Sequence, residues 1–372
     1  MATSRIIVIG ASAGGLEAIL TIVRKLPRDL PASIFIVLHS SSSGTTFFTQ
    51  LVQRACPFVV YTPADGEPIN DGHIYLPRAD HHLTLRPGVI RVTLGPKVNG
   101  FRPAIDPLFR TAARSYGPRA VGVILSGLMD DGTLGLLMIK RQGGVAIVQD
   151  PADAMFPDMP ENAIANVTAD HVVPAAKIAD VLQYVVSQRI HEEAEAMLAK
   201  DVPTDVAVSG GKGLEDKIFA GPPSGLTCPH CGGSLWELKE GKITSFRCHT
   251  GHGFTTAALM EEQLHSLDGA LWSALRALEE SAEMRRRLAH RAEVRSQQDL
   301  ASAYTREAAE FETRADLLRE VILTRPAHHP RPDQFEHGPK NTKGRMPKRA
   351  QRAAPESTKR VQPRTVKPRR AR

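Results

Sequence analysis

A serine and a histidine each follow or end a short apolar segment near the start of the chain. Ser12 lies in the stretch 10–14, GASAG, which fits the G-x-S-x-G pattern of a sharp strand-to-helix turn that exposes a nucleophilic serine. The same stretch half-fits the phosphate turn of a dinucleotide-binding unit, which would require an acid on the next strand. That next apolar segment, 33–39, ends in His39 instead. The pair therefore predicts a serine nucleophile and an imidazole base.

A third apolar segment leads into an acidic turn. Residues 120–125 are followed by SGLMDDG, so Asp130 or Asp131 is expected to supply the carboxylate that orients the base. The pattern alone does not choose between the two, and an Asp just before a helix also serves as an N-cap. The backbone N–H of Ala13, one residue past the serine, is the expected oxyanion donor.

Alternating apolar and helical segments position these residues. Segments such as VGVILSG (121–127) are apolar almost throughout, as expected of strands covered on both faces of a sheet. We predict an α/β fold, a doubly wound and mostly parallel sheet with helices on both faces, which binds ligands at the carboxyl ends of its strands. The middle stretch, 57–103, is expected to be an antiparallel insertion. Strands are predicted over 5–10, 33–39, 73–77, 120–127 and 145–150, and helices over 16–25, 45–54, 106–116, 132–142 and 175–186.

Three of the four cysteines lie close to histidines in a short later stretch. Cys228 and Cys231 form a C-P-x-C-G knuckle, and Cys248 follows with two histidines after it. We favour His252 over His249 as the fourth ligand, because a residue next to Cys248 tends to point away from a metal held by that cysteine. Three thiolates and one imidazole make a closed tetrahedral zinc site, which is structural because it leaves no open position. The unit resembles small zinc ribbons, which fold only with metal. Reduced, unliganded cysteines or a redox pair are the alternatives.

Residues 256–323 carry two apolar stripes at helical spacing. Burial of both stripes requires an α-helical hairpin or a dimeric coiled coil, so self-association through residues 256–325 is one expectation. The stripes are Leu264, Leu267, Leu271, Leu275 and Leu278, and then Leu300, Tyr304, Ala308, Phe311, Ala315 and Leu318.

The net charge of the 372-residue chain is +7, but the excess lies at its end. Residues 327–372 contain fourteen Lys or Arg and three Asp or Glu, so the rest of the chain is mildly acidic. This tail is expected to be disordered, either as a solubilising end or as a contact for nucleic acid or an anionic membrane. We find no signal peptide and no apolar run long enough to span a bilayer, which predicts a cytoplasmic location.

Composition divides the chain into segments. The 42% apolar content supports a sizeable core, and the 5% aromatic content makes that core mainly aliphatic. A polar, glycine-rich stretch after the predicted sheet indicates a linker. We predict a catalytic domain over 1–190, a linker over 191–226, a zinc-ribbon-like unit over 227–255, a helical region over 256–325 and a basic tail over 326–372.

Five ordered motifs over about residues 4–186 resemble the catalytic domain of the chemotaxis protein-glutamate methylesterases, the CheB family. IGASAGG resembles the family's I-G-A-S-T-G-G, LHSS stands at its Q-H-M-P, and GFRPAIDPLF resembles R-H-R-P-S-V-D-x-L-F. GVILSGLMDDG resembles G-V-I-L-T-G-M-G-x-D-G, and PDMPENAI resembles G-M-P-R-E-A-I. The resemblance puts the family's catalytic serine, histidine and aspartate on Ser12, His39 and Asp131.

This resemblance implies hydrolysis of glutamyl methyl esters on the cytoplasmic helices of chemoreceptors, with release of methanol. In some members it also implies deamidation of glutamine. The implied partners are methylated, chemoreceptor-like helical proteins and a signalling kinase or methyltransferase, and no cofactor is implied for catalysis. Typical members carry a phosphate-accepting receiver domain first. Because the first predicted strand starts near residue 5, we expect no receiver domain here.

The motifs depart from the family beside the reacting residues. Leu128 and Met129 stand where the family has Met-Gly before the aspartate, and two serines replace Met-Pro after His39. The positions expected to line the substrate are Leu128, Met129, Met159 and Arg102, with a structural ion pair as the alternative for Arg102. A non-catalytic scaffold or signalling adaptor that uses the zinc and helical modules is the alternative to an enzyme. A nucleotide-binding protein is the third interpretation.

Overall fold

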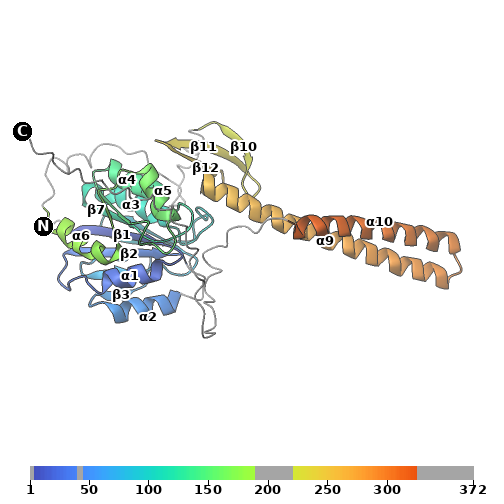
Figure 1. The fold of residues 1–372 in the computed structure, drawn as a ribbon, viewed down its shortest axis with the longest axis horizontal. Helices are drawn as coiled ribbons and strands as arrows, with labels where there is room; N and C mark the ends of the chain where they lie inside the picture. The colour runs from blue at the N-terminus through green and yellow to red at the C-terminus, as the bar shows by residue number, and fades with distance from the viewer. Residues whose placement is uncertain (1–3, 40–44, 189–220, 325–372) are drawn as a thin grey trace, which may run out of the picture. The chain divides into compact units, whose positions relative to one another are not determined.

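The computed structural model describes residues 4–39, 45–188 and 221–324. Residues 4–188, the sheet domain, contain a seven-stranded sheet in the order β3-β4-β2-β1-β7-β8-β9, and every neighbouring pair is parallel (Figure 1). The chain therefore extends the sheet to one side of β1 first and to the other side later. The strands are β1 (Arg5–Ala11), β2 (Ala32–Leu38), β3 (Val59–Tyr61), β4 (His73–Tyr75), β7 (Ala120–Ile124), β8 (Val145–Gln149) and β9 (His171–Val173).

Helices cover both faces of this sheet (Figure 1). Alternate side chains of β1 point to opposite faces, so Ile7 and Ile9 pack into one core and Ile6 and Val8 into the other. The predicted doubly wound α/β fold is confirmed. One core is covered by α1 (Gly15–Val23), α2 (Thr45–Ala55) and α6 (Ala175–Ser187), and the other by α3 (Ile105–Tyr116), α4 (Thr133–Arg141) and α5 (Asp158–Asn166).

The stretch 57–103 differs from the predicted antiparallel insertion. Its first two strands, β3 and β4, join the main sheet in parallel beside β2. The reason is that Ile74 and Tyr75 supply fully buried side chains to both faces, which a strand inside a covered sheet requires. Only β5 (His82–Arg86) and β6 (Val89–Thr93) form a separate antiparallel pair.

Residues 221–255, the Cys/His unit, form a small antiparallel sheet in the order β10-β11-β12-β13. Its first strand begins at Pro223, before the boundary predicted at residue 227, and most of the predicted linker lies outside the described residues. The strands are β10 (Pro223–Thr227), β11 (Ser234–Glu240), β12 (Ile243–Cys248) and β13 (Gly253–Thr255). The buried core of the unit and the start of the next helix is Cys228, Leu235, Phe246, Cys248, Phe254, Ala258 and Leu259.

Two long helices, α9 (Thr256–Val294) and α10 (Gln298–Leu323), form a helical hairpin (Figure 1). The predicted leucine stripe is only partly correct, because Leu267 is 47% exposed and Leu300 is 43% exposed. Small side chains that recur every seven residues make most of the buried seam instead, since they let two helices approach closely. The seam contains Leu275, Ala282 and Ala289 on α9, and Ala301, Ala308, Ala315 and Ile322 on α10.

Among the described residues, no helix is both long enough and apolar enough to cross a membrane. The basic tail predicted over 326–372 lies outside the described residues.

Candidate functional site

The carboxyl ends of β1, β2 and β7 bring the predicted reacting residues to one edge of the sheet. Ala11 pairs with Leu38 in the β1–β2 register, so Ser12 and His39 occupy the next position on each strand. The backbone N–H of His39 still donates to the carbonyl of Ala11 at 3.1 Å. On the other side, the N–H of Ser12 donates to the carbonyl of Ser126 at 3.0 Å, just past β7. Parallel strands thus supply the site from three neighbouring ends.

Ser12 is buried, and its Oγ has no hydrogen-bond partner among the described residues. A Cβ atom on Gly127 would lie 2.8 Å from the Cβ of Ser12 and 2.0 Å from the Sδ of Met159, so only glycine fits between them. The carbonyl of Ala13 accepts a hydrogen bond from the Ser126 hydroxyl at 2.8 Å, which ties the turn to β7. The oxyanion role of the Ala13 N–H stays a prediction.

His39 has one ring nitrogen engaged and one free. Its Nε2 lies 2.9 Å from Oδ2 of Asp131, and both side chains are 2% exposed. If Nε2 carries the proton and donates to the carboxylate, Nδ1 keeps a lone pair, and Nδ1 has no partner among the described residues. The Phe101 ring stacks on the imidazole with centroids 3.8 Å apart. The imidazole is therefore fixed in orientation and keeps the basic nitrogen that proton abstraction needs.

The Asp131 carboxylate accepts four hydrogen bonds. Oδ2 accepts from His39 Nε2 and from the N–H of Ile105, the latter at 2.6 Å. Oδ1 accepts from Asn99 Nδ2 at 2.9 Å and from the N–H of Asp106 at 3.3 Å. Burial raises the pKa of Asp131, but the hydrogen bond and charge of His39 and the other donors outweigh it and hold that pKa below its usual value. Asp131 is therefore ionised at neutral pH.

Two further acids lie beside Asp131. Asp106 is buried on α3, and desolvation, followed by the negative charge of Asp131, raises the pKa of Asp106 to about 8. Asp130 accepts a hydrogen bond from the Thr255 hydroxyl at 2.8 Å, and burial raises the pKa of Asp130 to about 6. At neutral pH, Asp106 keeps a proton while Asp131 does not, so the carboxylate charge is concentrated where it meets His39.

The four residues predicted to line the substrate lie in different environments. Leu128 and Met129 are partly exposed, and Met129 packs against the core of the Cys/His unit. Met159 is fully buried in the sheet-domain core. Arg102 forms an ion pair with Asp80 at 2.9 Å, which is the structural role weighed as its alternative. Contact of these four residues with substrate stays a prediction.

Sequence reasoning missed three residues that contact the site. Asn99 binds Asp131, Phe101 covers His39, and Thr255 binds Asp130. Phe101 is the second residue of the GFRPAIDPLF motif and Asn99 immediately precedes that motif, which is the one local signal that this stretch matters. Thr255 lies 125 residues from Asp130 along the chain, and no spacing rule joins the two.

The sulfur and nitrogen donors of the Cys/His unit gather at one point. One atom each from Cys228, Cys231, Cys248 and His252 lies within 4.8 Å of the other three. The Sγ atoms of Cys231 and Cys248 are 3.6 Å apart, and Nδ1 of His252 is 3.5 Å from Cys248 and 3.7 Å from Cys228. A tetrahedron with arms of about 2.3 Å has edges of about 3.7 Å, so the group fits a zinc ion in size and in donor chemistry.

The two neighbouring histidines, His230 and His249, are not members of the Cys/His donor group. The group contains His252 and does not include His249, although His249 adjoins Cys248. His230, between the first two cysteines, has its Nε2 2.7 Å from Oε2 of Glu262 on α9. The Cys/His group is therefore connected to the start of the hairpin through His230.

Comparisons with known proteins identify the part of the chain that carries the site. Residues 7–182 match the family model described as CheB methylesterase. These residues form a CheB methylesterase domain. The resemblance expected from the motifs is thus confirmed over that range.

Similar proteins match about half of this chain. A protein-glutamate methylesterase/protein-glutamine glutaminase 1 of Xanthomonas campestris is 41% identical over 184 residues, which are 48% of this chain and 51% of the relative. A protein of the same type from Bordetella bronchiseptica is 39% identical over 194 residues, 51% of this chain and 55% of the relative. The chain thus spans about half the length of these relatives. The crystal structure of the Thermotoga maritima CheB methylesterase catalytic domain aligns at 32% identity with a TM-score of 0.47, over 49% of this chain and 98% of that one.

Proposed function

We propose that the CheB methylesterase domain hydrolyses glutamyl methyl esters on helical, chemoreceptor-like proteins. Ser12 is the nucleophile, His39 the base and Asp131 the orienting carboxylate. The observation that carries the proposal is the 2.9 Å pairing of His39 Nε2 with Asp131, together with the buried His39 Nδ1 and Ser12 Oγ, neither of which has a partner among the described residues. The names of the relatives from Xanthomonas and Bordetella support the same activity.

The reaction proceeds by acyl transfer. Ser12 Oγ attacks the ester carbonyl carbon while His39 Nδ1 takes the hydroxyl proton, and Asp131 stabilises the resulting imidazolium. The N–H of Ala13 and the N-terminus of α1 stabilise the oxyanion. Collapse of the tetrahedral intermediate breaks the C–O bond, and His39 returns the proton to the departing methanol. Water then attacks the acyl-Ser12 ester with His39 as base, which releases the glutamate side chain. Deamidation of glutamine follows the same steps, with ammonia as the leaving group.

The Cys/His group is proposed to hold a structural zinc ion. Four protein donors complete a tetrahedral site and leave no coordination position for substrate or water. The metal would join the connection between β10 and β11, which contains Cys228 and Cys231, to the end of β12 at Cys248. Hydrolysis by Ser12 needs no cofactor in this scheme.

The remaining expectations are part of this proposal. A signalling kinase or methyltransferase partner, self-association through residues 256–325 and a cytoplasmic location are consistent with a chemoreceptor-like substrate. A contact of the tail with nucleic acid or membrane stays a prediction. The scaffold alternative is not favoured, because a non-catalytic protein has no use for a buried His39–Asp131 pair and a buried serine hydroxyl that has no partner among the described residues.

Release of labelled methanol from receptor helices tests the proposal. The full chain, Ser12→Ala and the control Ser187→Ala are compared, since Ser187 is an exposed serine at the end of α6. Methanol release is expected to fall by about 10⁶-fold in Ser12→Ala and to stay unchanged in Ser187→Ala. Release by Ser12→Ala at the rate of the unmodified chain would remove Ser12 as nucleophile. A folded chain that neither releases methanol nor reacts with a fluorophosphonate at Ser12 would favour the scaffold.

A further inference from the structure

We infer that Asn99 is a positioning residue that couples the Cys/His unit to the orientation of Asp131. The inference rests on the proposed function, because it takes Asp131 as the carboxylate that orients His39. It adds a dependence of hydrolysis on a part of the chain that lies beyond the CheB methylesterase domain.

The side-chain amide of Asn99 joins two buried carboxyl groups. Its Nδ2 donates to Oδ1 of Asp131 at 2.9 Å and to Oδ2 of Asp106 at 3.1 Å, so both amide hydrogens are used. Asn99 is 3% exposed, and its backbone has a φ of +52°, a conformation that asparagine tolerates better than most residues. Asn99 thus determines which way one oxygen of Asp131 faces.

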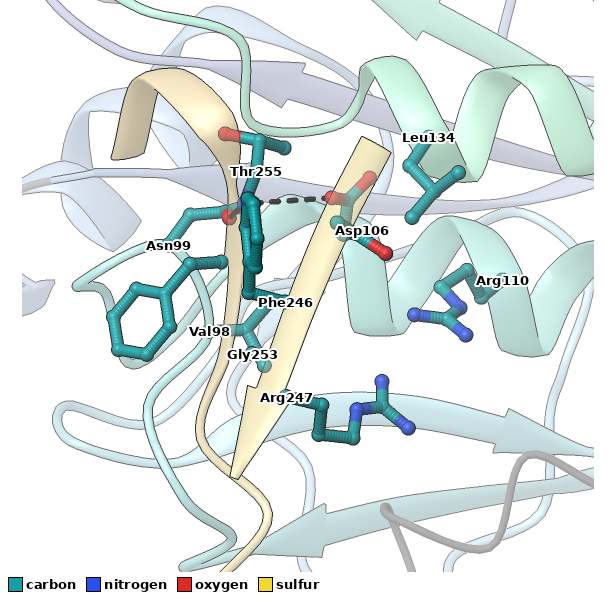
Figure 2. Close-up of a pocket in the computed structure, with 11 residues that line it drawn as sticks. Val98, Asn99, Asp106, Arg110, Leu134, Phe246, Arg247, Gly253 and Thr255 are labelled. Atoms are coloured by element: carbon teal, nitrogen blue, oxygen red, sulfur yellow. Dashed lines mark hydrogen bonds between the residues drawn. The ribbon is translucent and has the colours of Figure 1, made fainter. Parts of the chain in front are cut away.

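The other polar atoms of Asn99 are engaged by β13. Its Oδ1 accepts the backbone N–H of Thr255 at 2.9 Å, and its own N–H donates to the carbonyl of Gly253 at 2.8 Å. Figure 2 shows the hydrogen bond between Asn99 and Asp106 at a pocket that Asn99, Asp106 and Thr255 line. Two partners of Asn99 therefore belong to the Cys/His unit and two to the sheet domain.

Thr255 makes a second connection to the same acids. Its hydroxyl donates to Asp130 Oδ1 at 2.8 Å and accepts the N–H of Ala258 at 3.1 Å, so it also caps the first turn of α9. One residue thus fixes the start of a 39-residue helix and the carboxyl group next to Asp131. A displacement of α9 at its first turn changes the hydrogen bonds of both Asp130 and Asn99.

The segment 98–101 transmits this contact to the base as well. Val98 bridges to Gly253, and Phe101, three residues later, stacks on the His39 ring. The same short segment therefore holds Asp131 through Asn99 and His39 through Phe101. A buried amide is costly to leave unpaired. If β13 moves, the segment 98–101 is therefore expected to move with it and to keep the hydrogen bonds of Asn99.

Steady-state kinetics of the full chain provides the first test. Asn99→Ala is expected to lower kcat by about 10²-fold with little change in KM, because it misplaces Asp131 without touching substrate. Thr255→Val is expected to lower kcat in the same direction, and Thr255→Ser, which keeps the hydroxyl, to restore it. Thr256→Ala is the matched control, since the Thr256 hydroxyl binds only the carbonyl of Thr244 within the Cys/His unit. Unchanged kcat in folded Asn99→Ala overturns the inference.

A double cycle with a zinc chelator tests the coupling itself. Chelation is expected to lower kcat in the unmodified chain and to lower it by a smaller factor in Asn99→Ala, because the two changes share the connection through Asn99 while Thr255 and Val98 keep theirs. Effects that multiply independently overturn the coupling through Asn99.

A readout without turnover separates this inference from the proposed function. The Nε2–H proton of His39 that donates to Asp131 is expected to give a downfield NMR signal, which His39→Gln assigns. Chelation and Asn99→Ala should each shift that signal, and Thr256→Ala should leave it in place. If the signal shifts but the chain hydrolyses no ester, the coupling stands and only the proposed esterase activity is rejected. If neither chelation nor Asn99→Ala shifts the signal, the coupling is rejected, whether or not the chain hydrolyses esters.

Discussion

The sheet domain and the Cys/His unit hold their chemically active groups in opposite ways. In the sheet domain, Ser12 and His39 end strands whose side chains fill two large apolar cores, and none of the reacting groups belongs to either core. In the Cys/His unit, Cys228 and Cys248 are themselves among the few buried core residues. A large apolar core therefore carries the first site, whereas the proposed zinc ion would hold the small sheet together through the donors of its own site, as expected for a unit with so little surface to bury.

The strongest test of this comparison is a substitution inside the sheet-domain site. Asp131→Asn should lower kcat by about 10⁴-fold, because an amide no longer stabilises the imidazolium and favours the wrong His39 tautomer. The chain should still fold, since the two apolar cores remain, although the amide nitrogen cannot accept the two hydrogen bonds that one Asp131 oxygen accepts. Asp130→Asn is the control, as it alters the adjacent acid without touching His39. Equal losses in the two variants, measured as methanol release, would contradict the assignment of Asp131.

Metal removal should separate the two regions by stability. A chelator is expected to abolish amide-exchange protection in β11 and β12, because four donors that hold the small sheet are released. Protection in β1 and β7 should persist. Hydrogen exchange followed by mass spectrometry measures both in one sample, with Cys56→Ser as a control for thiol chemistry outside the Cys/His group. Loss of protection in all four strands would show that the sheet domain does not fold independently of the metal.

The pH dependence of unfolding tests a buried acid of the sheet domain, Asp106. Because the pKa of Asp106 is raised to about 8, the folded chain keeps a proton that the unfolded chain releases above about pH 4. The free energy of unfolding should therefore fall as the pH rises from about 4 to about 8, by at most about 1.4 kcal/mol per pH unit. Asp106→Asn should flatten this fall. Urea unfolding midpoints at pH 5 and pH 8 measure this loss of stability. If the midpoint of the variant falls between these pH values as much as that of the unmodified chain, Asp106 is not the cause.

The hairpin gives the smallest expected effect, because its seam is separate from both sites. Ala308→Leu should destabilise the hairpin by about 1–3 kcal/mol, since a larger side chain does not fit the alanine seam. Ala309→Leu, on the exposed side of the same turn, should be nearly neutral. Thermal unfolding followed by helical circular dichroism compares the two variants. A cost at residue 309 that equals the cost at residue 308 would place the seam on another face.

Local pattern was sufficient for the strands β1, β2 and β7 that lead into the sheet-domain site, but it did not predict α5, which carries Met159. The apolar residues 120–125 predict a covered strand and the structure has β7 there, because a strand buried on both faces needs apolar side chains at every position. Pattern was partly correct for the leucine stripe, because Leu271, Leu275 and Leu278 lie in or against the buried cluster of the hairpin while Leu267 stays exposed. Helical spacing indicates an apolar face without indicating which of its positions the other helix covers.

The sequence by itself determined the residue types at the ends of β1, β2 and β7 and the four donors of the Cys/His unit, because strand ends and knuckles are local features. Residue pattern alone did not determine whether Asp130 or Asp131 pairs with His39, and only the family resemblance favoured Asp131. Only the tertiary structure decided that Asn99 and Thr255 join the two regions. The reason is that these hydrogen bonds link residues 156 and 32 positions apart, and no periodicity along a chain encodes which distant amide meets which buried carboxylate.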